Sequence, residues 1–138
     1  MINLETLTKE QIIEILDRYL IENVLEEDND IFLESPARLY IRIEEDRPIL
    51  RIMSFVNIGI FNEQQKENIL SIMDDVNQAS YSLKYSTISR DGKTQAILCE
   101  YGIPLYGNVD DKFLIKALRH VEKEIVDFKT FAPTVLDK

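Results

Sequence analysis

A β-hairpin between residues 81 and 105 constrains the fold of this chain more than any other stretch. Two strand-like runs, at residues 81–88 and 94–101, flank the tetrapeptide Arg90-Asp91-Gly92-Lys93. An Asp-Gly pair accepts the positive φ values that a tight type I′ turn requires, so it is a strong hairpin signal. We therefore predict two antiparallel strands here, with one amphipathic helix before them and another after them.

The N-terminal segment predicts a helix that starts at Thr8, where Gln11 completes a capping box. Its apolar positions recur at helical spacing. They are Ile12, Ile13, Leu16, Tyr19 and Leu20. An acidic run from Glu22 to Asp30 follows, and it lacks the ligand spacing of a calcium loop. We interpret this run as a solvated helix end and loop, and predict no metal site.

Three strands are predicted next, at residues 31–34, 37–43 and 49–56. The second alternates cleanly, with Leu39, Ile41 and Ile43 pointing inward. The third is apolar on both faces. A strand of that kind is covered on both faces, by helices or by another chain.

A second helix is predicted to begin at Asn62 and to end at Asn77-Gln78, and a third opens near Asn108 or Asp110. The predicted core face of the third helix comprises Phe113, Leu114, Ala117, Leu118, Val121, Ile125 and Phe128. The order is thus α-β-β-β-α-β-β-α. This order indicates an α+β fold, an antiparallel sheet with packed helices, in a single domain spanning residues 1–138.

Composition narrows the classes of function. The chain has 138 residues, 45% of them hydrophobic, which suits one globular domain with its own core. A net charge of −9 argues against nucleic-acid binding, which needs clustered Lys and Arg. No apolar run approaches the ~20 residues that span a bilayer. With one cysteine and no signal-peptide pattern, the expected location is cytoplasmic.

The sequence offers no set of catalytic residues. His120 is the single histidine, and it is expected on the surface. Cys99 lies in a strand pattern and is expected to be a small buried hydrophobe, because no base is near it in sequence. The four glycines form neither a GxGxxG nor a P-loop pattern, so no cofactor is predicted.

A basic ridge is predicted on the third helix. Lys112, Lys116, Arg119 and Lys123 form a narrow stripe opposite the apolar face, at roughly 100° per residue. In a chain this acidic, the ridge is a candidate contact for an acidic partner segment or for the Glu22–Asp30 region of a neighbouring molecule. The alternative is an ordinary solvated helix face.

An apolar patch is predicted on the sheet. Ile97, Cys99, Tyr101 and Ile103 alternate on one face of the last strand, so Ala96 and Leu98 point to the other. Together with Met53 and Phe55, they would form an apolar patch on any sheet face that helices leave uncovered. Monomers rarely expose large patches of this kind. The patch therefore predicts self-association or docking of another protein, unless helices cover both faces.

Several local patterns resemble the bacterial YbjN family, whose members are described as candidate regulators of sensory transduction and share their fold with the type III secretion chaperones. These patterns are Asp75-Val76-Asn77-Gln78, Tyr81-Ser82-Leu83-Lys84-Tyr85, Ile103-Pro104-Leu105-Tyr106-Gly107 and Phe128-Lys129-Thr130-Phe131-Ala132-Pro133. The resemblance covers residues 7–133. It implies a non-enzymatic protein that binds other proteins, often as a homodimer, and it transfers no active-site residues.

The leading hypothesis is therefore a dimeric protein-binding module that acts as a regulator or chaperone-like adaptor. A second hypothesis is an inhibitor or immunity-type protein whose acidic surface, at Glu22–Asp30, blocks a basic enzyme. An enzyme or small-ligand binder is a third, and it would require a deep pocket that gathers titratable groups.

Overall fold

The hairpin is present in the computed structural model, which describes residues 1–57, 63–80, 82–90 and 93–136. Its strands are β6 (Lys84–Arg90) and β7 (Lys93–Pro104), which pair antiparallel from Lys84↔Glu100 to Arg90↔Lys93. The predicted turn residues Asp91 and Gly92 lie outside the described residues. The two predicted strands are confirmed, and β7 runs three residues further than expected.

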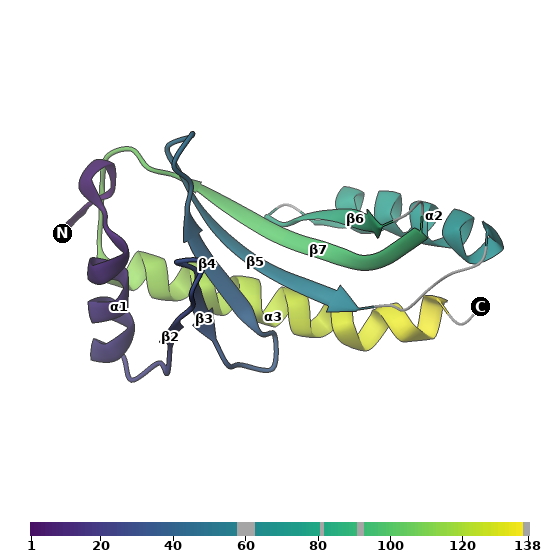
Figure 1. Cartoon of the computed structure of the whole chain (residues 1–138), viewed down its shortest axis with the longest axis horizontal. Helices are drawn as coiled ribbons and strands as arrows, with labels where there is room; N and C mark the ends of the chain where they lie inside the picture. The colour runs from purple at the N-terminus through teal and green to yellow at the C-terminus, as the bar shows by residue number, and fades with distance from the viewer. Residues whose placement is uncertain (58–62, 81, 91–92, 137–138) are drawn as a thin grey trace.

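The hairpin forms one side of a six-stranded antiparallel sheet with the order β2-β3-β4-β5-β7-β6. Its other strands are β2 (Val24–Leu25), β3 (Ile31–Leu33), β4 (Leu39–Ile43) and β5 (Ile49–Asn57). The long strands β5 and β7 pair from Ile49↔Pro104 to Asn57↔Ala96 and curve together through the middle of the molecule (Figure 1). The predicted α+β class with an antiparallel sheet is confirmed. Three two-residue strands were not predicted, β2 and the separate pair β1 (Ile2–Asn3) and β8 (Asn108–Val109).

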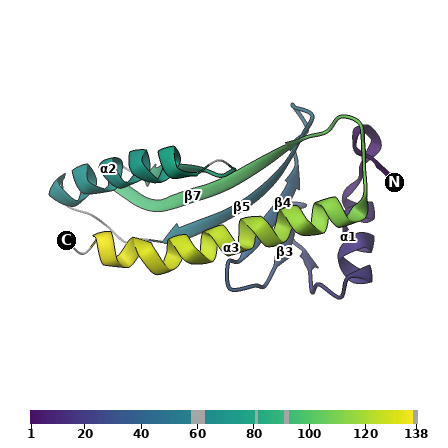
Figure 2. The ribbon, with the colours of Figure 1, turned by 180° about the vertical axis from the view of Figure 1, so that it is seen from behind.

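Three α-helices accompany the sheet: α1 (Lys9–Arg18), α2 (Glu63–Ala79) and α3 (Asp111–Leu136). Helices α2 and α3 lie on the same face of the sheet, and α1 lies at one end of the molecule beside the start of α3 (Figure 2). A short 3-10 turn, η1 (Leu4–Thr6), precedes α1. The predicted capping box of α1 is present: Thr8 Oγ1 accepts from the Gln11 amide, and the Gln11 side chain accepts from the Thr8 amide. Among the described helices, none has the length and apolar character that crossing a membrane demands.

The core lies between the sheet and the helices. Each α-helix contributes at least one side chain that is almost fully buried, including Leu16 from α1, Ile69 from α2, and Val121 and Ile125 from α3. Cys99 of β7 is in the same layer and is 0% exposed, as predicted. Burial of such apolar surface is the main stabilising contribution to the fold.

Two residues assigned to the apolar faces of predicted helices are exposed to solvent. Leu20 is 91% exposed, because α1 ends at Arg18 and the chain reverses there with a φ of 59° at Leu20. Phe113 is 42% exposed. It is rotated by about 100° from the neighbouring core residue Leu114, so it falls off the edge of the buried stripe of α3.

Candidate protein-binding surfaces

Helices leave one face of the sheet uncovered (Figure 1), and the strand register places an apolar band on that face. Its members lie on β2, β3, β4, β5 and β7. They are Val24, Phe32, Tyr40, Met53, Phe55 and Leu98. Tyr40 pairs with Phe32 on one side and with Met53 on the other. Phe55 pairs with Leu98. Directly paired residues of adjacent strands project to the same face, so the band crosses almost the whole sheet.

Aromatic contacts order the centre of the band. The Phe32 and Tyr40 rings are 5.0 Å apart between centroids, and the Tyr40 and Phe55 rings meet edge to face at 5.8 Å. The guanidinium of Arg38 lies 5.7 Å from the Phe32 ring centroid, within cation–π range. Phe55 is nevertheless 44% exposed, and Val24 at the sheet edge is 59% exposed. Pre-positioned aromatic side chains with free surface are typical anchors of protein interfaces.

The four sheet residues expected to form the patch, Met53, Phe55, Ala96 and Leu98, do lie on this one face. Two of them are not accessible there. Met53 is 2% exposed and Ala96 is 8% exposed. Met53 lies in the middle of the sheet, directly opposite Tyr40, and the large side chains around it take up the surface. The accessible part of the patch is therefore Phe55 and Leu98, and the predicted contribution of Met53 and Ala96 as open surface is corrected.

An ionic clamp occupies the same face beside the band. Arg51 of β5 donates from Nη1 to Glu44 at 2.7 Å and from Nη2 to Glu100 of β7 at 2.5 Å. Hydrogen bonding to Glu44 is the main reason that the pKa of Arg51 is raised. A hollow of about 510 Å³ lies over these groups. It gathers titratable side chains, but the guanidinium and the two carboxylates engage one another, which is the arrangement of a structural ion-pair cluster.

The acidic run from Glu22 to Asp30 is solvated, with one exception. Asp30 is 4% exposed and accepts two hydrogen bonds from Arg42, each of 2.7 Å. This fork-to-fork geometry is the strongest form of the pair, and it raises the pKa of Arg42. The described residues contain no group of three or more His, Cys, Asp or Glu side chains placed to hold a metal ion.

The predicted basic ridge lies on the other side of the molecule from the apolar band. Lys112, Lys116, Arg119 and Lys123 are all exposed on α3, on the surface that points away from the sheet. Arg119 lies 3.5 Å from Glu122 one turn further along the helix. The structure therefore separates the two groups of predicted site residues, since α3 and the sheet lie between the ridge and the band.

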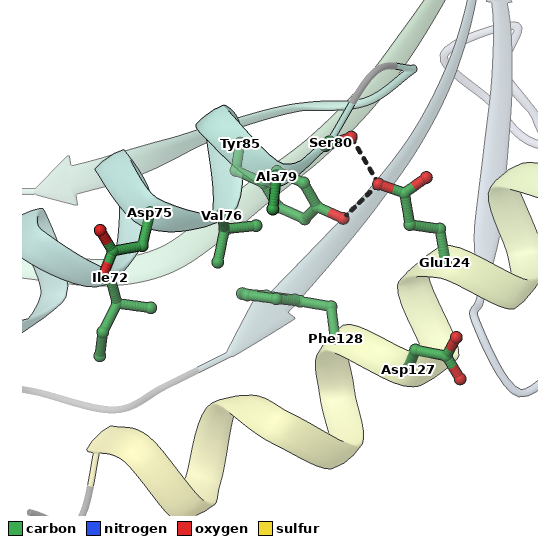
Figure 3. A pocket seen from close by; sticks show the side chains of 9 residues that line it. All are labelled: Ile72, Asp75, Val76, Ala79, Ser80, Tyr85, Glu124, Asp127 and Phe128. Atoms are coloured by element: carbon green, nitrogen blue, oxygen red, sulfur yellow. Dashed lines mark hydrogen bonds between the residues drawn. The ribbon is translucent and has the colours of Figure 1, made fainter.

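Sequence reasoning missed a groove between α2 and α3, shown in Figure 3. The groove has a volume of about 520 Å³. Its apolar floor is formed by Ile72, Val76, Ala79, Tyr85 and Phe128. Its acidic rim is formed by Asp75, Glu124 and Asp127. The Tyr85 and Phe128 rings pack at 4.8 Å between centroids, which fixes the floor.

Hydrogen bonds hold one carboxylate of the acidic rim in place. Glu124 Oε1 accepts from the Ser80 hydroxyl at 2.5 Å and from the Tyr85 hydroxyl at 3.1 Å (Figure 3). Its Oε2 lies 3.5 Å from Nε2 of His120, which is half exposed and also contacts Ser82. Burial, followed by the charge of Glu124, raises the pKa of Tyr85, so this phenol stays protonated. Burial likewise raises the pKa of the Cys99 thiol to about 12, which makes it a poor nucleophile.

No family model matches this chain, and no curated protein matches it in sequence. Solved structures do match it in fold. YbjN from E. coli superposes on this chain with a TM-score of 0.77 at 10% identity, covering 91% of this chain and 90% of YbjN. The description of YbjN proposes a role in transcription regulation. An uncharacterized protein from Methanothermobacter thermautotrophicus gives 0.58 at 16% identity, covering 88% and 95%.

A third match comes from the HopA1-SchA chaperone–effector complex, with a TM-score of 0.58 at 8% identity, covering 85% of this chain and 88% of that one. Identities this low establish a shared backbone arrangement and not a shared activity. The resemblance drawn from the sequence is thus confirmed at the level of structure: this chain has the YbjN-like fold, which is also similar to that of a chain in the HopA1-SchA chaperone–effector complex.

Proposed function

We propose that this protein is a non-enzymatic protein-binding module, acting as a regulator or chaperone-like adaptor and forming a homodimer. The observation that carries the proposal is the apolar band on the helix-free face of the sheet, with Phe55 44% and Val24 59% exposed. A monomer gains nothing from keeping ordered aromatic side chains in water, whereas an interface uses them as anchors.

The fold neighbours support the same kind of role. One was solved in a chaperone–effector complex, and another is described with a proposed role in regulation. Binding would draw affinity from the apolar band and orientation from the charged groups beside it, Arg51, Glu44 and Glu100. The expected location remains cytoplasmic, and the expected partner is another protein.

Two substitutions test the proposal on the purified protein. Phe55→Asp and Leu98→Asp place a carboxylate in the band, which an apolar interface tolerates poorly because the charge must be desolvated. The matched control is Phe113→Asp, which changes a phenylalanine of similar exposure (42%) on α3. We expect light scattering to show a dimer for the native protein and the control, and a monomer for the two band variants.

A monomeric native protein whose affinity-captured partners are unchanged by Phe55→Asp would contradict the proposal. The same capture experiment distinguishes the inhibitor hypothesis from the proposed function. A basic enzyme held by the exposed carboxylates Glu26, Glu27 and Asp28 would be retained by the band variants and lost when those three are replaced by Gln or Asn.

A further inference from the structure

We infer that the groove between α2 and α3 is a second binding site and that it takes a basic amphipathic peptide. The apolar side chains of the peptide would lie on the apolar floor, and its Lys or Arg side chains would meet the acidic rim. This inference goes beyond the proposed function and is independent of it. The groove lies on the helix side of the sheet and shares no residue with the apolar band.

The shape of the groove suits a ligand. Its volume of about 520 Å³ lies within the range of ~300–1,000 Å³ that ligand pockets occupy. The floor is already built, since Phe128 is buried against Tyr85 and Tyr85 is held by Glu124. Within this floor, Val76 and Ala79 of α2 keep accessible surface. A preformed apolar floor lowers the cost of ordering the site on binding.

The rim selects the charge of the ligand. Asp75 and Asp127 are exposed, and neither forms a hydrogen bond or an ion pair with another described residue. The third rim carboxylate, Glu124, is held in place by Ser80 and Tyr85. An anionic ligand would be repelled by three carboxylates, and a neutral apolar ligand would desolvate the carboxylates without giving them a hydrogen-bond or ionic partner, which is unfavourable. A cationic ligand is the one whose charge complements the rim.

The position of the rim residues favours a peptide over a small cation. Asp75 belongs to α2, whereas Glu124 and Asp127 belong to α3, so acidic residues of both helices line the groove (Figure 3). A small ligand with one positive charge satisfies one side only. A helical segment with apolar residues at i, i+3, i+4 and i+7 presents an apolar stripe to the floor and basic residues to both sides at once.

The test uses a fluorescein-labelled helical peptide with Leu at those positions and Lys at the others, together with a matched peptide carrying Glu in place of Lys. Binding is followed by fluorescence anisotropy at physiological salt, because screening removes most long-range attraction there. We expect saturable binding of the Lys peptide and binding at least about tenfold weaker for the Glu peptide.

The double variant Asp75→Lys with Asp127→Lys is expected to weaken binding of the Lys peptide by about tenfold or more. Its control is Asp74→Lys with Glu10→Lys, which changes the net charge by the same amount at exposed sites outside the groove. This control and Phe55→Asp should leave the affinity within about twofold of native. Ala79→Phe, which fills the groove without changing charge, should weaken binding of the Lys peptide about as strongly as the rim variant.

Three results would overturn the inference: no saturable binding, equal affinity for the two peptides, or equal weakening by the rim variant and its charge-matched control. None of them bears on the apolar band, whose test is the oligomeric state. Conversely, a native monomer that binds the Lys peptide through the groove would leave this inference standing while removing the proposed dimer.

Discussion

Replacing Leu20 by glycine should stabilise this protein, although it removes a large hydrophobic side chain. Helix α1 ends in a Schellman arrangement: the Leu20 amide donates to the Asp17 carbonyl at 3.0 Å, and the Ile21 amide donates to the Leu16 carbonyl at 2.9 Å. This turn requires a left-handed residue at the Leu20 position, where φ is 59°. Glycine is the common residue there because it has no Cβ to clash.

Three contributions set the size of the effect. A left-handed conformation costs an L-residue roughly 1–2 kcal/mol, and glycine removes that cost. Glycine also gives the unfolded chain more conformational freedom, which lowers the free energy of unfolding by about 0.4–1 kcal/mol and so offsets part of that gain. The lost packing is small, about 0.2 kcal/mol, because Leu20 is 91% exposed. The free energy of unfolding should therefore rise by about 0.5 kcal/mol.

Urea unfolding followed by far-ultraviolet circular dichroism measures this change as a shift in midpoint at constant slope. The matched control is Leu20→Ala, which removes the same side chain but keeps the strained backbone, and it should change stability by no more than about 0.2 kcal/mol. A glycine variant that is no more stable than the alanine variant would refute the reasoning, since the two differ mainly in their tolerance of positive φ.

Three further predictions follow from buried or clamped groups. Ser54→Ala should lower the free energy of unfolding by about 1 kcal/mol, because its fully buried hydroxyl donates to the Ala37 carbonyl at 2.5 Å. Nζ of Lys129 is the second donor to the Ala37 carbonyl, at 3.0 Å. The double variant Ser54→Ala with Lys129→Met should therefore lower the free energy of unfolding by more than the sum of the two single variants. Additive shifts of the urea midpoint would contradict this. Burial raises the pKa of the Cys99 thiol to about 12, so at pH 8 this thiol should react with an aromatic disulfide reagent at least ~100-fold faster in the unfolded protein than in the native one. The contribution of the protonated thiol to stability should fall as the pH rises from about 8.5, the pKa of the thiol in the unfolded chain, toward 12. Equal reaction rates in native and urea-unfolded protein would disprove the burial argument. Arg51→Met should lower the free energy of unfolding by about 1–2 kcal/mol, because it leaves the partly buried carboxylates of Glu44 and Glu100 without their cation. A thermal midpoint equal to that of the native protein would show that the ion pairs are not needed for stability.

The fold could be predicted from the sequence where a signal was local and repeated. The Asp91-Gly92 pair and the alternation on both sides of it located β6 and β7, and the Thr8 capping box located the start of α1. Two-residue strands such as β2 could not be found, because two residues carry no periodicity. Leu20 was misplaced because helical spacing continues through a C-terminal turn that only backbone conformation reveals.

The candidate sites were harder to predict, for a different physical reason. Alternation assigned Phe55 and Leu98 to the outward face correctly, but it could not show that Met53 is shielded by its neighbours on the sheet. Nor could it show that Phe32 and Tyr40 extend the band, since this depends on strand order and register. The groove brings together α2, β6 and α3, and no local pattern in the chain indicates that these elements meet.

The two proposed surfaces could be occupied at the same time. The apolar band and the groove lie on opposite faces of one sheet, so a ligand on one does not occlude the other. If two copies bury the band between them, each groove stays outside that interface, and a partner can still reach the acidic rim. If the native protein is a monomer, the band remains free and offers an apolar surface to a partner. The oligomeric state therefore decides whether the band is free to recognise a partner, and light scattering combined with the peptide titration distinguishes the two arrangements.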